Sequence, residues 1–122
     1  METGRTVLIV DDDKHLCELI HHILENEDFQ IECAYTLKEA HTKWKTRKPE
    51  IILLDIHLPD GNSLDLIESD KELLADCKVI AVTADHKPAT RKRAVAMGIE
   101  HYLEKPFSLK QIRVLVNEII VS

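Results

Sequence analysis

Three short aliphatic runs limit the fold of this 122-residue chain more than any other feature. Residues 7–10 (VLIV), 51–54 (IILL) and 79–82 (VIAV) carry no polar side chain and are rich in β-branched residues. Runs of this length and composition are typical of strands buried on both faces of a parallel sheet. Between the first two runs, residues 16–24 place apolar side chains at the spacing of an amphipathic helix. The chain therefore alternates strand and helix signals from its start.

Alternation, capping and turn residues predict the remaining elements. They are an edge strand at 29–33, a helix from Thr36 that stops near Pro49, a turn at 58–61, a helix at 63–74, a helix closed by Gly98, a short strand at Tyr102 and Leu103, and a helix from Ser108 to about Ile120. Two of the helix starts carry a Glu or Gln three residues after the cap, Glu39 and Gln111, as in a capping box. Gly98 suits the left-handed residue that ends a helix.

Five strands that alternate with five helices predict one α/β domain over residues 1–122. Parallel neighbours need right-handed helical crossovers, so the helices should cover both faces of a single parallel sheet. We expect a flavodoxin-like, doubly wound three-layer sandwich with strand order 2-1-3-4-5. A chain of this length has no room for a second core.

Composition excludes several classes of protein. With 44% hydrophobic and 31% charged residues the chain is globular rather than disordered. Its aliphatic runs fall far short of the ~20 apolar residues that span a bilayer, and we find no secretory signal. Cys17, Cys33 and Cys77 are an odd number in apolar-patterned segments, so we expect reduced thiols, no disulfide and a cytoplasmic location. The three glycines are too far apart to build a GxGxxG or Walker phosphate loop.

The formal net charge of −6, from 22 acidic and 16 basic residues, disfavours nucleic acid as a direct ligand. The charge is unevenly placed, because residues 86–113 carry 7 basic and 2 acidic side chains. That segment is either a solvated surface or a positive recognition face near Lys87, Arg91, Lys92 and Arg93.

Five polar residues stand at the ends of the predicted strands. They are Asp11, Asp12, Asp55, Thr83 and Lys105. Because parallel strands share one carboxyl edge, these side chains should gather on the rim where such sheets bind ligands. Three clustered carboxylates repel one another, and a divalent cation such as Mg²⁺ would relieve the repulsion. The lysine and the threonine could then bind a phosphoryl group, which leaves Asp55 as the nucleophile that forms an acyl phosphate.

The combination of these motifs resembles one family. The acidic cluster in VLIVDDD, the aspartate in IILLDIHLPDG, the threonine in VIAVTAD and the lysine in YLEKPF are similar to those of the receiver domain of two-component response regulators, in particular the chemotaxis-type single-domain receiver. The resemblance implies that Asp55 is the phosphoacceptor. It also implies that Asp12 binds Mg²⁺ (or Mn²⁺) directly, Asp11 directly or through water, and His57 through its backbone carbonyl. The family's Lys-Pro bond is typically cis, which implies the same for Lys105–Pro106.

The resemblance further implies a signalling switch rather than an enzyme. A sensor histidine kinase or phosphotransfer protein would transfer a phosphoryl group to Asp55, and Thr83, Lys105 and the backbone N–H of Ala84 would bind it. Thr83 would move toward the new phosphoryl group and Tyr102 would rotate inward. These movements would bias the face built from the fourth helix, the fifth strand and the fifth helix, where an effector or a second copy could bind.

Position along the chain suggests two further hypotheses. His57 and Asp85 flank the predicted pocket, so we predict that they tune how fast water reaches the acyl phosphate. Val114, Ile120 and Val121 lie off the buried stripe of the last helix, so we predict that some are exposed and form a partner or homodimer surface.

Three alternative functions share parts of this pattern. A Mg²⁺-dependent aspartyl-phosphate hydrolase of the haloacid-dehalogenase type uses the same residue types, but it places the nucleophile first and the acidic pair last. A flavodoxin-like flavin binder would need a Ser/Thr/Gly-rich phosphate loop where this chain has DDDKHL. A degenerate receiver that only docks partners is disfavoured because all five site positions are intact. His15, His21 and His22 are interpreted as solvated helix residues rather than metal ligands.

Overall fold

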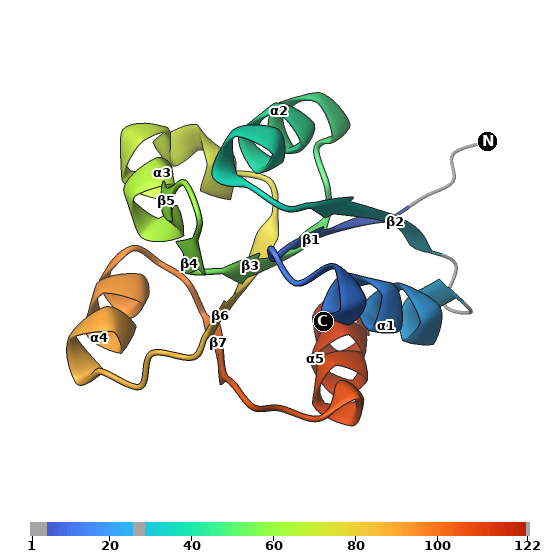
Figure 1. Cartoon of the computed structure of the whole chain (residues 1–122). Helices are drawn as coiled ribbons and strands as arrows, with labels where there is room; N and C mark the ends of the chain where they lie inside the picture. The colour runs from blue at the N-terminus through green and yellow to red at the C-terminus, as the bar shows by residue number, and fades with distance from the viewer. Residues whose placement is uncertain (1–4, 26–28, 122) are drawn as a thin grey trace.

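A computed structural model describes residues 5–25 and 29–121 of the chain. Its centre is a parallel sheet in the order β2-β1-β3-β6-β7 (Figure 1). The strands are β1 (Arg5–Val10), β2 (Phe29–Ala34), β3 (Ile51–Asp55), β6 (Lys78–Thr83) and β7 (His101–Glu104), with a separate hairpin of β4 (His57–Leu58) and β5 (Gly61–Asn62). The helices are α1 (Lys14–Leu24), α2 (Leu37–Arg47), α3 (Ser63–Ser69), the 3-10 helix η2 (Lys71–Leu74), α4 (Pro88–Ala96) and α5 (Leu109–Val121). Counted along the main sheet, this is the predicted order 2-1-3-4-5.

Successive residues of each central strand point to opposite faces of the sheet, which builds two cores. In β1, Leu8 and Val10 pack with residues of α2, α3 and α4, whereas Val7 and Ile9 pack with residues of α1 and α5. Figure 1 shows the same division, with α1 and α5 on one face of the sheet and the other helices on the opposite face. The predicted three-layer α/β sandwich is confirmed.

The predicted helix caps are largely confirmed. Ser108 and Gln111 form a reciprocal capping box, in which each backbone N–H donates to the other side chain at 2.8 and 3.2 Å. At the start of α2, the Thr36 hydroxyl accepts the N–H of Glu39 at 3.1 Å. The Glu39 carboxylate accepts the N–H of Tyr35 at 2.7 Å, one residue earlier than the simple motif predicts.

The region after β3 differs most from the prediction. The turn at 58–61 is present, and the two-residue strands β4 and β5 flank it. A single helix at 63–74 is wrong, because α3 ends at Ser69 and η2 follows. The backbone of Asp70 leaves the helical region (φ −143, ψ 80), and its carboxylate lies 3.0 Å from Nε2 of His41 on α2. A tertiary contact therefore accompanies the break in the helix.

The prediction that some apolar side chains of the last helix are exposed is confirmed at one position. Val114 is 44% exposed, as expected. Ile120 is half-buried and packs against the core beneath α1 and α5, so it does not belong to an exposed stripe. The side chain of Val121 lies outside the described residues. Neither α5 nor any other helix in the described ranges is long and apolar enough to cross a membrane.

Candidate functional site

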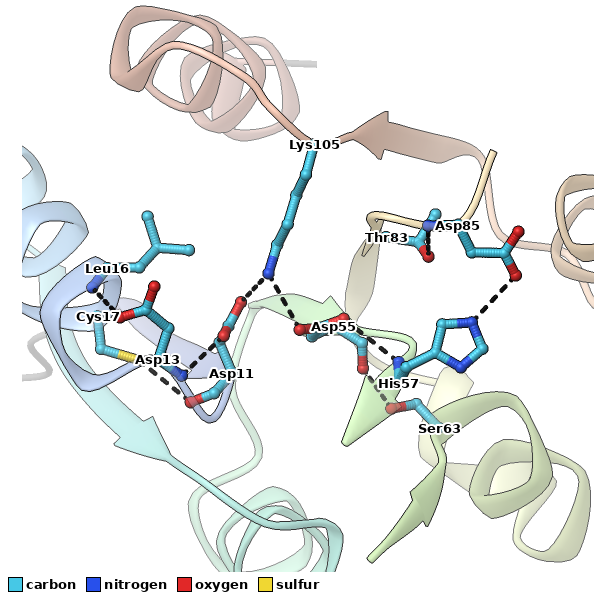
Figure 2. A network of polar contacts seen from close by, with 10 residues as sticks. All are labelled: Asp11, Asp13, Leu16, Cys17, Asp55, His57, Ser63, Thr83, Asp85 and Lys105. Atoms are coloured by element: carbon cyan, nitrogen blue, oxygen red, sulfur yellow. Dashed lines mark hydrogen bonds and ion pairs between the residues drawn. The ribbon is translucent and has the colours of Figure 1, made fainter. Parts of the chain in front are cut away.

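The carboxyl edge of the sheet brings together polar residues from four strand ends (Figure 2). Asp11 follows β1, Asp55 ends β3, Thr83 ends β6 and Lys105 follows β7. The backbone fixes two of them, because the N–H of Asp11 donates to Ala34 at 3.0 Å and the N–H of Lys105 donates to Thr83 at 2.8 Å. The hydrogen bonding of the sheet thus continues one residue past β1 and β7.

Lys105 joins two buried carboxylates. Its Nζ lies 3.0 Å from Oδ2 of Asp11 and 3.1 Å from Oδ2 of Asp55, and the two aspartates are 4% and 6% exposed. Burial first, and then the charge of Asp11, raise the pKa of Asp55 against the opposing effect of Lys105. Burial alone would lower the pKa of Lys105, but the hydrogen bonds and charges of the two carboxylates outweigh it and the pKa is raised. The Lys105–Pro106 peptide bond is cis, as the resemblance implied.

Asp12 completes an acidic cluster at this edge. One carboxylate oxygen from each of Asp11, Asp12 and Asp55 lies within 4.8 Å of the others, and only Asp12 is exposed. The N–H of Asp13 donates to Oδ1 of Asp11 at 2.9 Å, while the Asp13 side chain caps α1 by accepting the N–H of Leu16 at 3.1 Å. Oxygen donors that are this close together, with one in contact with solvent, fit a hard divalent cation that keeps some of its water.

Further polar groups surround Asp55. The N–H of His57 donates to Oδ1 of Asp55 at 3.3 Å, and the hydroxyl of Ser63 donates to the Asp55 backbone carbonyl. Thr83 is fully buried, and its Oγ1 accepts the N–H of Asp85 at 2.9 Å. Because that bond uses the oxygen as an acceptor, the Thr83 hydroxyl can still donate its proton to a ligand.

A contact between His57 and Asp85 lies to one side of Asp55 (Figure 2). Nε2 of His57 lies 3.1 Å from Oδ2 of Asp85, which also accepts the hydroxyl of Thr90 at 2.7 Å. The other Asp85 oxygen accepts the N–H of Lys87 at 2.7 Å. The bond from Thr90 and then that from Lys87 lower the pKa of Asp85 to about 2, so the group is ionised at neutral pH. Ala84 lies exposed at the start of the same loop.

Tyr102, on β7, packs half-buried against the core beneath α4. Its hydroxyl oxygen is buried and has no hydrogen-bond partner within the described ranges, and burial raises its pKa. The guanidinium of Arg91 on α4 lies over the ring, 4.7 Å from its centroid, as in a cation–π contact. The hydroxyl of Tyr102 is therefore already inside the protein in this conformation.

Comparison with known proteins agrees with this geometry. A family model described as the response regulator receiver domain matches residues 7–117. The chain is 32% identical to the transcriptional regulatory protein CrdR of Helicobacter pylori over 93% of this chain and 54% of that protein. It is 33% identical to the phosphate regulon transcriptional regulatory protein PhoB of Pseudomonas aeruginosa over 89% of this chain and 48% of that protein. The chain thus spans about half the length of these curated relatives.

Solved structures share the fold. The non-phosphorylated HemR receiver domain from Leptospira biflexa has a TM-score of 0.87 and 30% identity, covering 96% of this chain and 94% of that chain. The beryllofluoride-activated NtrC4 receiver domain dimer has a TM-score of 0.85 and 33% identity, covering 95% and 96%. The dehalogenase-type hydrolase is not favoured by any of these similarities. This chain belongs to the response regulator receiver domain family of two-component signalling.

Proposed function

We propose that residues 1–122 form one receiver domain in which Asp55 is the phosphoacceptor. The observation that carries the proposal is the Lys105 ammonium held between the buried carboxylates of Asp11 and Asp55 at the carboxyl edge of the sheet. In the transfer, an Asp55 carboxylate oxygen attacks the phosphorus of a phosphohistidine and forms the P–O bond of an acyl phosphate. The P–N bond breaks, and the imidazole nitrogen leaves with the electron pair.

Asp11, Asp12, Asp55 and the backbone carbonyl of His57 are the groups that would hold Mg²⁺ or Mn²⁺. The spacing and exposure of the three carboxylates support this assignment. The cation would neutralise the excess negative charge of the cluster and of the incoming phosphoryl oxygens.

The chain's own donors complete the phosphoryl site. Lys105 supplies a mobile point charge that can move from the carboxylates to a phosphoryl oxygen. Thr83 can donate its hydroxyl proton while it keeps the bond from the N–H of Asp85. The backbone N–H of Ala84, the next residue, is the third proposed donor.

Thr83 and Tyr102 lie on the neighbouring strands β6 and β7 and are the proposed switch. A bond from Thr83 to the phosphoryl group would shift the start of the β6–α4 loop. The buried Tyr102 hydroxyl has no hydrogen-bond partner among the described residues, so no such bond opposes a change in its position. The face of α4, β7 and α5 would transmit the change, and the exposed Val95 and Val114 lie on its two helices.

His57 and Asp85 are proposed to tune dephosphorylation. Their contact lies next to Asp55. The hydroxyl of Thr90 donates to the Asp85 carboxylate and holds it in position. A pair held in this way restricts the direction from which water can reach the acyl phosphate.

Receiver domains act with histidine kinases and effectors rather than as turnover enzymes, and one similar structure is a dimer. For this chain we propose a sensor histidine kinase or phosphotransfer protein as the donor, and an effector or a second copy at the α4, β7 and α5 face. We propose no direct nucleic acid or membrane contact for this domain, and a cytoplasmic location.

Acetyl phosphate with Mg²⁺, followed by intact-mass spectrometry, tests the phosphoacceptor. We expect the wild type to gain one phosphoryl group and Asp55→Asn to gain none. Asp76→Asn, which changes an exposed aspartate far along the chain from the cluster, should label like the wild type. Label that persists in Asp55→Asn, or sustained turnover of a phosphate monoester by the wild type, would contradict the proposal.

A further inference from the structure

The hairpin of β4 and β5 carries a residue of the candidate site and reaches across to α2. It begins two residues after Asp55, and its first residue is His57, whose N–H donates to Oδ1 of Asp55 at 3.3 Å. At its tip, Asp60 accepts the N–H of Leu37 at 2.8 Å on Oδ1 and the N–H of Lys38 at 3.1 Å on Oδ2. These are the first two residues of α2, so one carboxylate joins the loop after β3 to the start of a helix that precedes it in the chain.

Other contacts hold the base of the hairpin rather than its tip. The N–H of Ile56 donates to the Val82 carbonyl at 2.9 Å, and the Ile56 carbonyl accepts the N–H of Ser63 at 2.8 Å. Leu58 is buried in the core that α2 and α3 cover. Among the hydrogen bonds of the described residues, the two that Asp60 accepts are the ones that join the tip to α2.

Gly61 brings the tip close to the same end of α2. A Cβ atom at Gly61 would lie 3.1 Å from Cδ1 of Leu37, and the residue has a positive φ of 147°. Glycine adopts such a backbone conformation without the strain that a side chain would bring. The capping carboxylate of Asp60 and the missing side chain of Gly61 therefore both fit the tip to the start of α2.

We propose that Asp60 is a positioning residue of the candidate site: by capping α2 it fixes the hairpin, and with it the backbone carbonyl of His57, for Mg²⁺ binding. The inference rests on the proposed function, because it takes that carbonyl as a metal ligand. Removal of a group that directly orients a metal ligand typically weakens metal binding by about 10- to 100-fold. Asp60 acts on His57 through the backbone of Leu58 and Pro59, so we expect a smaller effect of about 3- to 10-fold.

Removal of the Asp60 carboxylate would release the tip. Two N–H groups at the start of α2 would lose their partner, and water would replace the bonds without holding the hairpin. The favourable interaction of the carboxylate with the positive end of the helix dipole would also be lost. The His57 carbonyl would then sample more orientations in the metal-free protein. A cation would have to fix those orientations when it binds, which lowers its affinity.

The test combines two measurements on the folded chain. Isothermal titration calorimetry with Mg²⁺ gives the affinity, and ¹⁵N relaxation of the metal-free protein gives the order parameters of the hairpin amides. Asp60→Ala should bind Mg²⁺ about 3- to 10-fold more weakly than the wild type. Its order parameters should be lower than those of the wild type at His57, Leu58 and Gly61. Asp60→Asn keeps one acceptor oxygen for the N–H groups of α2 and should recover part of the affinity.

Gly98→Ala is the matched control, because it should also destabilise the fold but lies with the first residues of β6 and β7, at the edge of the sheet opposite to Asp55. It should bind Mg²⁺ like the wild type, which separates positioning from a general loss of stability. The inference is overturned if Asp60→Ala keeps the affinity or the hairpin order parameters of the wild type. It is also overturned if Asp60→Asn binds no better than Asp60→Ala, or if Gly98→Ala loses as much affinity. A wild type that binds no Mg²⁺ would overturn the proposed metal site, and the inference with it.

Discussion

Replacement of Lys105 by methionine tests the ion pairing that organises the site. Methionine keeps most of the aliphatic stem and removes the charge. The ammonium lies 3.0 and 3.1 Å from two carboxylates whose side chains are only 5% and 8% exposed. Loss of one partner of a buried ion pair costs about 3–5 kcal/mol. The Lys105 side chain itself is 26% exposed, so water replaces part of the lost interaction, and we expect a loss of about 2–3 kcal/mol.

Thermal unfolding followed by circular dichroism measures this loss. In EDTA, Lys105→Met should unfold roughly 8–12 °C below the wild type, given the usual scaling for a domain of this size. Excess Mg²⁺ should stabilise the variant more than the wild type, because a cation bound to the folded state supplies the missing positive charge.

Lys92→Met is the matched control, since Lys92 is an exposed lysine on α4. Its free energy of unfolding should stay within about 0.5 kcal/mol of the wild type. Equal melting temperatures for Lys105→Met and the wild type in EDTA would refute the argument, and so would an equal loss in Lys92→Met.

Three further predictions concern stability and can be measured by urea unfolding. Asp60 accepts the N–H groups of the first two residues of α2 at 2.8 and 3.1 Å, so Asp60→Asn should cost about 1 kcal/mol at pH 7, while Asp76→Asn should cost little. These bonds lower the pKa of Asp60. The Asp60 carboxylate therefore stabilises the fold at pH values above its unfolded-state pKa, and this stabilisation is lost as the pH falls through its folded-state pKa. Plots of the free energy of unfolding against pH for Asp60→Asn and the wild type that fail to converge in acid would contradict this. Gly98 has φ 92 with open space around it, so Gly98→Ala should lose about 1–2 kcal/mol from backbone strain alone, and an unchanged midpoint would exclude the strain. The indole N–H of Trp44 donates to the Leu73 carbonyl at 3.0 Å, so Trp44→Phe should lose about 1–2 kcal/mol, and a neutral result would show that the bond adds nothing.

The residues at the carboxyl edge of the sheet could be predicted from the sequence, because short neighbouring stretches of sequence mark where each strand ends. The apolar runs show where the strands end, and the polar residues that follow within two positions are visible in the chain. Parallel topology then brings Asp11, Asp55, Thr83 and Lys105 to one edge without further information. The structure places these residues together and adds the distances.

The loop contacts could not be predicted, because they join residues far apart in sequence through irregular backbone. Nε2 of His57 lies 3.1 Å from Oδ2 of Asp85 across 28 positions of sequence, and no capping or periodicity signal marks that contact. The break between α3 and η2 has the same character, since His41 meets Asp70 across 29 positions of sequence. Local propensity favoured one helix, and the chain leaves the helix at Asp70, where the side chain contacts α2.

The basic segment shows how tertiary contacts change the meaning of a charge count. Arg93 donates to Asp65 at 2.6 Å and to Glu68 at 2.8 Å, both on α3. Arg91 lies over the Tyr102 ring. Two of the four basic residues that favoured a positive recognition face are thus engaged within the chain, which weakens that interpretation.

Asp11 and Asp12 differ in how firmly the protein holds their carboxylates. Its N–H donates to Ala34, its carbonyl accepts the Cys17 thiol, and its two carboxylate oxygens accept from Asp13 and Lys105. Every polar group of this buried residue is therefore engaged within the protein, so a ligand would meet it already in place. Asp12, the neighbouring carboxylate, is exposed, so in the proposed site it is the carboxylate that could adjust to an entering cation. The end of β1 therefore contributes one carboxylate held by the protein and one exposed carboxylate to the acidic cluster.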